Sequence, residues 1–205
     1  MINGKEIKVS RGVYPPSDDT FLLIDALGPA KAGRALELCC GTGVVGLCAA
    51  DGIEEITALD INPEAARNTI QNYDDNGLGD KLGVIVGDLF TPLRKQEFDL
   101  VFMNPPYLPD DEGMPEDQAW SGMKRGRAII DRFIYGLGGY LGPEGRALFL
   151  QSTVNGIDAS LELIREQGMI GRVAAEKRFQ FEGLVVIEVR YATIAANGIT
   201  DLQKD

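Results

Sequence analysis

The sequence predicts a single α/β domain with a seven-stranded, mostly parallel sheet and helices on both of its faces. From Arg34 onward, short apolar runs typical of buried strands alternate with segments of helical character. A glycine-rich turn at 41–46 separates the first such strand from the helix that follows it. Repeated strand–helix units require mostly parallel strands that are covered on both sides. The two final strands are joined by the short segment 181–183, so the sheet should end in an antiparallel hairpin.

Each element follows from local signals. Ser17 is a typical helix N-cap followed by two acidic residues, and Gly28-Pro29 ends that first helix. Asn62 caps a later helix that has Pro63 at its first position. The stretch 104–122 is rich in Pro, Asp, Glu and Gly and is expected to be irregular. The predicted strands are 35–39, 56–59, 82–86, 98–103, 146–151, 171–178 and 184–191, and the other predicted helices are 44–50, 63–73, 124–138 and 157–167.

The bulk composition excludes several classes of protein. A chain of 205 residues fits one domain, expected over 1–195, followed by a flexible tail over 196–205. The sequence has no apolar run long enough to cross a membrane and no signal-peptide core, so we expect a cytoplasmic protein. Three cysteines and no histidine argue against a disulfide framework, a bound metal and histidine-based catalysis. A net charge of −11 argues against strong nucleic-acid binding by this chain alone.

A candidate nucleotide site lies at the end of the first strand. Residues 37–46 read Glu-Leu-Cys-Cys-Gly-Thr-Gly-Val-Val-Gly, which contains the full G-x-G-x-x-G pattern between a strand and a helix. Gly41 and Gly43 allow the backbone to approach a ligand closely and leave helix-start N–H groups available. Asp60 ends the next strand, where its carboxylate can accept both hydroxyls of a ribose. A tight turn without a ligand is the simpler alternative.

The same pattern suits either a dinucleotide or S-adenosylmethionine. Glu37 favours S-adenosylmethionine, because a carboxylate fits poorly beside a pyrophosphate and well beside a sulfonium or an ammonium. Asp88 ends the third strand and could accept a hydrogen bond from the adenine amino group, with Leu89 packing near the ring. Asp88 could instead only cap the strand end.

The acceptor motif is Asn104-Pro105-Pro106-Tyr107, directly after the apolar run 98–103. The Asn side-chain carbonyl and a backbone carbonyl of the Pro-Pro pair can accept both hydrogens of a planar NH2 group and so aim its lone pair at an electrophile. The prolines hold these carbonyls rigid, and Tyr107 offers a flat surface for stacking. An amide nitrogen is a poor nucleophile, so its positioning must provide most of the catalysis. The alternative is an Asn-Pro turn that closes a strand.

Taken together, the chain resembles the class I, Rossmann-like, S-adenosylmethionine-dependent methyltransferases with an N-P-P-Y motif. It resembles in particular the release-factor glutamine methyltransferases of the HemK/PrmC type, in their compact archaeal and eukaryotic branch. The segment 13–23, Val-Tyr-Pro-Pro-Ser-Asp-Asp-Thr-Phe-Leu-Leu, is similar to that branch's Y-E-P-A-E-D-T-F-L-L signature, and similarity continues at 119–122, 126–127 and 130–133. Pro15 and Asp18 stand where the family has Glu, so this chain departs from the signature at these positions.

This resemblance implies specific roles and partners. The substrate would be the glutamine of the Gly-Gly-Gln motif in a class I release factor, and a small zinc-binding activator subunit would complete a heterodimer. The residues implied to contact the cofactor are Thr20, Glu37, Gly41 and Gly43 near the methionine end, Asp60 at the ribose, and Asp88 and Leu89 at the adenine. Asn104 would also contact the cofactor. The acceptor amide would be held by Asn104, Pro105, Pro106 and Tyr107.

Other functions remain open on the sequence. An N6-adenine methyltransferase would use the same N-P-P-Y chemistry, because an exocyclic amine presents the same planar NH2, although the acidic charge weighs against it. A dinucleotide-dependent oxidoreductase would use the same glycines. A scaffold that binds the cofactor without catalysis is disfavoured by the complete motif at 104–107. Asp131 and Arg132 are expected to form a structural ion pair.

Overall fold

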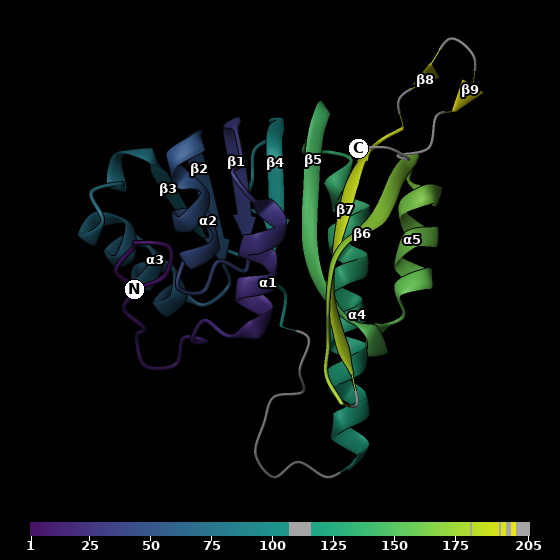
Figure 1. Cartoon of the computed structure of the whole chain (residues 1–205), viewed down its shortest axis with the longest axis horizontal. Helices are drawn as coiled ribbons and strands as arrows, with labels where there is room; N and C mark the ends of the chain where they lie inside the picture. The colour runs from purple at the N-terminus through teal and green to yellow at the C-terminus, as the bar shows by residue number, and fades with distance from the viewer. Residues whose placement is uncertain (107–115, 181, 193, 196–197, 200–205) are drawn as a thin grey trace.

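The computed structural model describes residues 1–106, 116–180, 182–192, 194–195 and 198–199, and for 116–126, 194–195 and 198–199 it describes the backbone alone. Its main sheet has seven strands in the order β3-β2-β1-β4-β5-β7-β6, running across the view in Figure 1. The strands are β1 (Ala32–Leu38), β2 (Ile53–Asp60), β3 (Leu82–Val86), β4 (Phe98–Met103), β5 (Leu141–Ser152), β6 (Met169–Arg178) and β7 (Gly183–Tyr191).

The strand pairing confirms the predicted mixed sheet. β1 pairs in parallel with β2 on one side and with β4 on the other, and β5 extends the parallel part from β4. β7 pairs antiparallel with both β5 and β6, as the predicted terminal hairpin requires. The chain order reverses between β1 and β4, and such a switch point is where ligands bind in α/β sheets.

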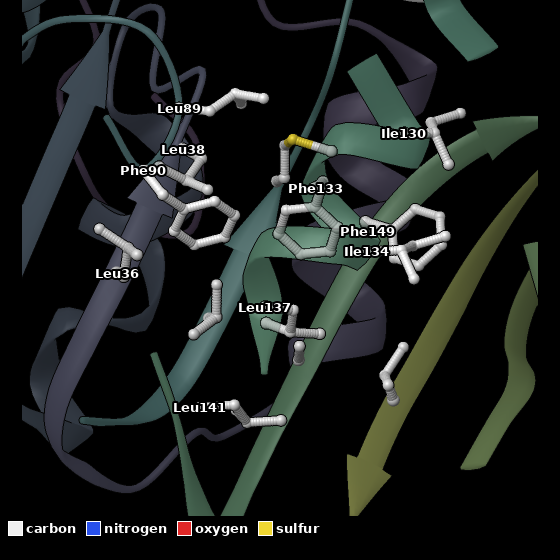
Figure 2. Packing of buried hydrophobic residues seen from close by; sticks show 14 of the residues in the cluster. Leu36, Leu38, Leu89, Phe90, Ile130, Phe133, Ile134, Leu137, Leu141 and Phe149 are labelled. Atoms are coloured by element: carbon white, nitrogen blue, oxygen red, sulfur yellow. The ribbon is translucent and has the colours of Figure 1, made fainter. Parts of the chain in front are cut away.

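Helices cover both faces of this sheet. One core contains residues of α4 and α5, and Figure 2 shows Phe133 of α4 beside Phe149 of β5, with ring centroids 5.4 Å apart. The opposite core is formed with α1, α2 and α3 and includes the fully buried Tyr73. The helices are α1 (Asp18–Leu27), α2 (Val44–Ala49), α3 (Pro63–Asp75), α4 (Glu116–Leu137) and α5 (Ile157–Glu166), with short 3-10 turns η1 (Ala50–Gly52), η2 (Gly79–Lys81) and η3 (Thr153–Asn155).

β1 and β2 each begin three residues before the predicted start, and two other boundaries depart further from the prediction. The helix expected at 124–138 begins at Glu116, so residues 116–122 are not irregular. Acidic residues in a first turn favour a helix N-terminus, and this outweighs the local glycine content. The strand expected at 146–151 begins at Leu141, because the register with β4 shifts between Phe98 and Leu100 and accommodates the Gly-Pro-Glu-Gly sequence at 142–145. Proline is tolerated in a strand at such an irregularity.

The predicted ion pair between Asp131 and Arg132 is also wrong. Arg127 pairs with Asp131 one helical turn away, and Arg132 pairs with Asp88 at 2.7 Å. Neighbouring residues of a helix point in different directions, whereas residues four apart lie on one face.

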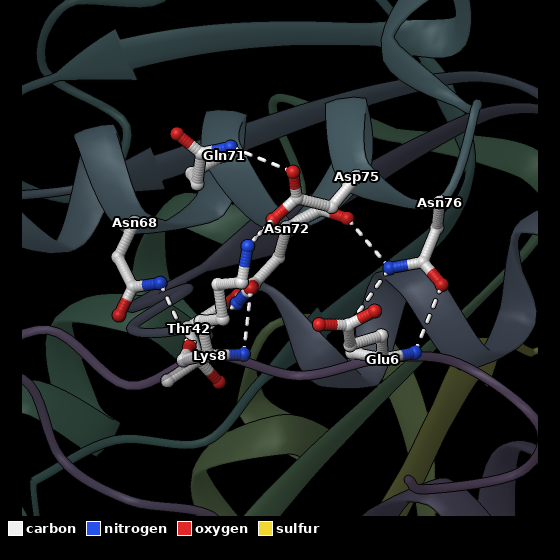
Figure 3. A network of polar contacts seen from close by, with 8 residues as sticks. All are labelled: Glu6, Lys8, Thr42, Asn68, Gln71, Asn72, Asp75 and Asn76. Atoms are coloured by element: carbon white, nitrogen blue, oxygen red, sulfur yellow. Dashed lines mark hydrogen bonds and ion pairs between the residues drawn. The ribbon is translucent and has the colours of Figure 1, made fainter.

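The N-terminal segment lies along α3 and is fixed by asparagine side chains (Figure 3). Asn76 exchanges two hydrogen bonds with the backbone of Glu6, at 2.9 and 2.8 Å. Asn72 does the same with Lys8, at 2.9 Å in both directions. The two asparagines lie four residues apart on one helix face. This anchoring determines where the following residues 12–16 reach the sheet.

Past β7 the backbone forms a small two-stranded sheet, β8 (Ile194–Ala195) with β9 (Gly198–Ile199). The predicted flexible tail at 196–205 therefore includes β9, while 196–197 and 200–205 lie outside the described residues. No helix in the described parts of the chain has the length and apolar character needed to cross a membrane.

Candidate active site

A cavity of about 580 Å³ opens at the carboxyl ends of β1, β2 and β4. This is the switch point of the sheet, and the size lies in the range of small-molecule sites. Residues of the N-terminal segment and of α1 close one side of it. The lining comprises Gly12, Val13, Tyr14, Pro16, Asp19, Thr20, Glu37, Cys39, Cys40, Gly41, Thr42, Val44, Val45, Asp60, Ile61, Asn62, Ala65, Asn104, Pro105 and Pro106.

The glycine-rich turn brings main-chain atoms to the cavity wall. Gly41 lines the cavity and has φ of +54°, while Gly43 caps α2 at φ of +71°. Positive φ favours glycine at both positions. At Gly43 a side chain would also meet Thr69 of α3, since a Cβ there would lie 2.6 Å from the Thr69 methyl carbon. Gly43 therefore allows the turn to pack on α3, and it does not itself line the cavity.

Asp60 links this turn to the start of α3. One carboxylate oxygen accepts the Gly41 N–H and the other accepts the Asn62 N–H, both at 2.9 Å. Each oxygen of a carboxylate has two acceptor positions, so these bonds leave capacity for two more donors. Asp60 lines the cavity and can accept a pair of neighbouring hydroxyls, as the sequence predicts.

Glu37 is a buried carboxylate at the end of β1, with only 3% of its surface exposed. Burial, reinforced by the nearby Asp60 charge and opposed by a hydrogen bond from the Gly46 backbone, raises the pKa of Glu37 to about 8. Its Oε2 atom has no hydrogen-bond partner. A buried acceptor without a donor costs free energy, so this oxygen would gain from a cationic ligand.

Asn104 follows β4 and contributes a second unpartnered acceptor. Its Nδ2 donates to Asp19 Oδ2 at 3.1 Å, while its buried Oδ1 has no hydrogen-bond partner. Asn104 lines the cavity together with Pro105 and Pro106. Tyr107, the fourth residue of the motif, lies outside the described residues.

The N-terminal turn of α1 meets Asn104 and completes the wall. Thr20 lines the cavity, and its Oγ1 donates to Asp19 Oδ1 at 3.2 Å and accepts the Ser17 N–H at 3.3 Å. Asp19 is 2% exposed and is the residue that sequence reasoning missed. The signal that could have identified it is the Asp-Thr pair within the 13–23 motif, in which only Thr20 was singled out.

Asp88 and Leu89 are not part of the cavity wall in the described structure. The Asp88 carboxylate is half exposed and pairs with Arg132. Leu89 is buried in the core on the α4 side of the sheet. Their assignment to the adenine therefore stays a prediction, and Asn62 and Ile61 are the residues that line the cavity next to Asp60.

The described residues include no group of three or more His, Cys, Asp or Glu side chains that could hold a metal ion. The cavity wall provides two unpartnered acceptors, a carboxylate with free acceptor positions and proline backbone. A glycine-rich turn beside a strand that ends in an acidic residue is typical of binding sites for nucleotide-derived cofactors.

Comparison with known proteins identifies the family. The model of the methyltransferase small domain matches residues 16–181. The chain belongs to this family. It is 35% identical over 191 residues to a putative protein N5-glutamine methyltransferase of Methanocaldococcus jannaschii, covering 91% of this chain and 95% of that protein. It is 32% identical over 191 residues to the methyltransferase HEMK2 of Homo sapiens, covering 86% of this chain and 88% of that protein.

A solved structure has the same fold. It is the E. cuniculi Mtq2-Trm112 complex, described as responsible for methylation of the translation termination factor eRF1. The match has a TM-score of 0.64 at 21% identity and covers 88% of this chain and 99% of the other. The expected methyltransferase fold and the expected HemK/PrmC-type membership are thus confirmed.

Proposed function

We propose that this enzyme transfers a methyl group from S-adenosylmethionine to the side-chain amide nitrogen of the glutamine in a Gly-Gly-Gln motif of a class I release factor. The observation that carries the proposal is the Oδ1 atom of Asn104, which is buried at the cavity and has no donor. Asn104 is followed directly in the sequence by two prolines, whose backbone lacks N–H groups. Such a site accepts hydrogens from a planar NH2 group and offers no competing donor.

The cavity fits the cofactor on the chemistry of its wall. Asp60 has free acceptor capacity for ribose hydroxyls, and Oε2 of Glu37 is a buried acceptor without a donor, suited to a cationic group. Thr20 lies close to Asn104 through their shared partner Asp19. When bound, S-adenosylmethionine supplies an electrophilic methyl group on a sulfonium.

The protein would contribute alignment more than proton transfer. Asn104 Oδ1 and a proline carbonyl would each accept one amide hydrogen, which turns the nitrogen lone pair toward the methyl donor. The N–CH3 bond would then form as the S–CH3 bond breaks, and the nitrogen would lose one proton to solvent. Holding reactants in such a near-attack geometry can lower a barrier by several kcal/mol. Glu37 and Asp60 would hold the donor in place during this step.

The names of the relatives support the choice of acceptor. The archaeal relative is named as a protein N5-glutamine methyltransferase, and it matches nearly the full length of this chain. The E. cuniculi complex is described as acting on a termination factor. A class I release factor is therefore the proposed substrate, and the cytoplasm, where translation ends, is the proposed location.

A small activator subunit is part of the proposal. The E. cuniculi protein with this fold is described in complex with Trm112. We expect this chain to co-purify with a small partner of that kind, and we propose that the partner binds zinc.

The test is methyl transfer from labelled S-adenosylmethionine with and without the candidate subunit. The acceptors are a release factor that carries Gly-Gly-Gln, the same factor with Gln replaced by Ala, and an adenine-containing oligonucleotide. Label on the first acceptor alone is the expected result. Label on the oligonucleotide would favour the adenine methyltransferase, and tight NADH binding without binding of S-adenosylhomocysteine would favour an oxidoreductase. An Asn104→Ala enzyme serves as the inactive control.

A further inference from the structure

Asp19 occupies an unusual position for a first-turn aspartate. First-turn acidic residues usually lie on the surface and interact with the helix dipole, as Asp18 does: it is half exposed and pairs with Lys177 at 3.0 Å. Asp19 is instead 2% exposed and lines the cavity. A buried carboxylate is costly unless its oxygens are hydrogen-bonded, so its partners explain its presence.

Both oxygens of Asp19 have partners. Oδ1 accepts the Thr20 N–H at 2.7 Å and the Thr20 hydroxyl at 3.2 Å. Oδ2 accepts from Asn104 Nδ2 at 3.1 Å. The carboxylate thus joins a residue on the cofactor side of the cavity to the residue expected to hold the methyl acceptor.

This contact decides which way the Asn104 amide points. An ionised carboxylate can only accept hydrogen bonds, so the Asn104 NH2 group must face Asp19. The Asn104 Oδ1 then has to face away, and it is the atom left buried without a donor. The opposite rotamer would bring two acceptors together at Asp19 and present an NH2 group to the substrate amide, where an acceptor is required.

We propose that Asp19 is the positioning residue that sets the polarity of the acceptor site by holding Asn104 with its carbonyl oxygen toward the substrate amide. The inference rests on the proposed amide methyl transfer and extends it to a residue with no direct part in the chemistry. The Asp19 carboxylate also orders the Thr20 hydroxyl, which couples the cofactor side of the site to the acceptor side.

The first test is Asp19→Asn with Asp18→Asn as the matched control. The Thr20 N–H and Asn104 Nδ2 bond to different oxygens of Asp19, and the substitution replaces one of these oxygens with an NH2 group, so one of the two contacts is lost. We expect kcat for release-factor methylation to fall at least tenfold, with the KM for the release factor and the affinity for S-adenosylhomocysteine changed less than threefold. Asp18→Asn removes the same charge one residue away and should keep wild-type kcat. A fall below tenfold in Asp19→Asn would overturn the proposal.

A second variant separates positioning from simple packing. Asp19→Asn combined with Asn104→Asp reverses donor and acceptor in the contact but again turns an acceptor oxygen toward the cavity. We expect this double variant to exceed the kcat of Asp19→Asn and of Asn104→Asp alone, since the latter places two carboxylates together. A double variant no faster than the singles would mean that Asp19 only supports packing, which contradicts the proposal.

Side-chain amide exchange gives a readout that does not depend on the substrate. In 15N-labelled protein, the Asn104 NH2 protons should exchange slowly with water in the wild type and at least tenfold faster in Asp19→Asn. Equal exchange rates would overturn the inferred contact. If wild-type protein methylates no release factor while the amide is protected, the proposed substrate fails and the Asp19–Asn104 contact stands.

Discussion

The side chain of Asn72 on α3 pairs with the backbone of Lys8 as a neighbouring strand would, accepting its N–H and donating to its C=O, each at 2.9 Å (Figure 3). Nδ2 of Asn72 also donates to the Thr42 carbonyl in the glycine-rich turn at 2.9 Å. One buried amide therefore ties the N-terminal segment to the cofactor side of the cavity. This matters for function because Gly12, Val13, Tyr14 and Pro16 of the same segment line that cavity.

We therefore expect Asn72→Ala to weaken cofactor binding as well as stability. The change leaves the buried Thr42 carbonyl without this donor, and unpaired buried polar groups cost about 1–3 kcal/mol each. Thermal unfolding and calorimetric titration with S-adenosylhomocysteine measure the two effects. Asn76→Ala is the control, because its side chain bonds only the backbones of Glu6 and Asn72, neither of which lines the cavity. Equal losses of affinity in both variants would contradict a specific role for Asn72.

Asn104→Ala should abolish methyl transfer while the cofactor still binds. Removing a hydrogen-bonding group that acts in the transition state costs on the order of 10²–10³ in kcat. The variant loses the unpartnered Oδ1 and also the Nδ2 donor to the buried Asp19, so we expect a loss of stability of about 1–3 kcal/mol that leaves the chain folded. Single-turnover methylation measures the rate of methyl transfer, and titration with S-adenosylhomocysteine measures cofactor affinity, in the variant and the wild type. Normal turnover in this variant would refute the mechanism.

Unlike Asn104→Ala, Asp60→Ala should weaken cofactor binding and so raise the dissociation constant of the cofactor. The carboxylate holds the N–H groups of both Gly41 and Asn62, so its loss removes ligand acceptors and loosens the turn. Hydrogen bonds to charged groups contribute about 1.5–3 kcal/mol, which corresponds to roughly 10- to 150-fold in affinity. Glu55→Ala, an exposed acidic residue on the same strand, controls for charge and should bind as the wild type does.

Glu37 should make both stability and cofactor affinity depend on pH. Its pKa is raised from an ordinary value of 4.5 to about 8, chiefly by burial. Between these values the folded chain keeps a proton that the unfolded chain releases, so the contribution of Glu37 to stability falls as pH rises through this window. An ammonium group placed beside Glu37 favours the ionised form, so affinity for S-adenosylhomocysteine, which carries such a group, should rise toward pH 8 with release of a proton.

Glu37→Gln provides the comparison for this pH effect. The variant should have a flatter dependence of the free energy of unfolding on pH between 5 and 8, and cofactor binding without proton release. Denaturant unfolding across that range, and calorimetry in two buffers with different ionisation enthalpies, measure these quantities. A wild-type pH profile in the variant would show that another group titrates.

Gly43→Ala should destabilise the fold more than Gly77→Ala does. Both glycines have positive φ, at +71° and +68°, so both substitutions introduce backbone strain. Only at Gly43 would the new methyl group meet a neighbour, Thr69, whereas nothing lies within 4 Å at Gly77. Overpacking adds about 1–3 kcal/mol to the strain. Chemical denaturation of the two variants gives the difference, and equal stabilities would mean that α3 can move away.

Local signals were enough to predict most of this molecule. The caps at Ser17 and Asn62, the apolar strands and the glycine turn act over a few residues, so they can be recognised without knowing the partner of each segment. The same is true of the acceptor motif, whose chemistry depends on adjacent residues. The mixed seven-stranded sheet and the cavity positions of Glu37, Asp60 and Asn104 were predictable in this way, whereas the methyltransferase family was suggested by the resemblance of several motifs to a known family.

Only the tertiary structure decided the contacts that span long stretches of chain. Asp19 and Asn104 are 85 residues apart, and the type of either residue does not predict the other as its partner. The bulged start of β5 depends on its register with β4, and the ion pair of Arg132 with Asp88, 44 residues away, depends on how α4 packs against the sheet. A sequence specifies local conformation through short-range sterics and hydrogen bonds. The polarity of the acceptor site instead depends on a buried contact that exists only once the sheet and α1 have packed together.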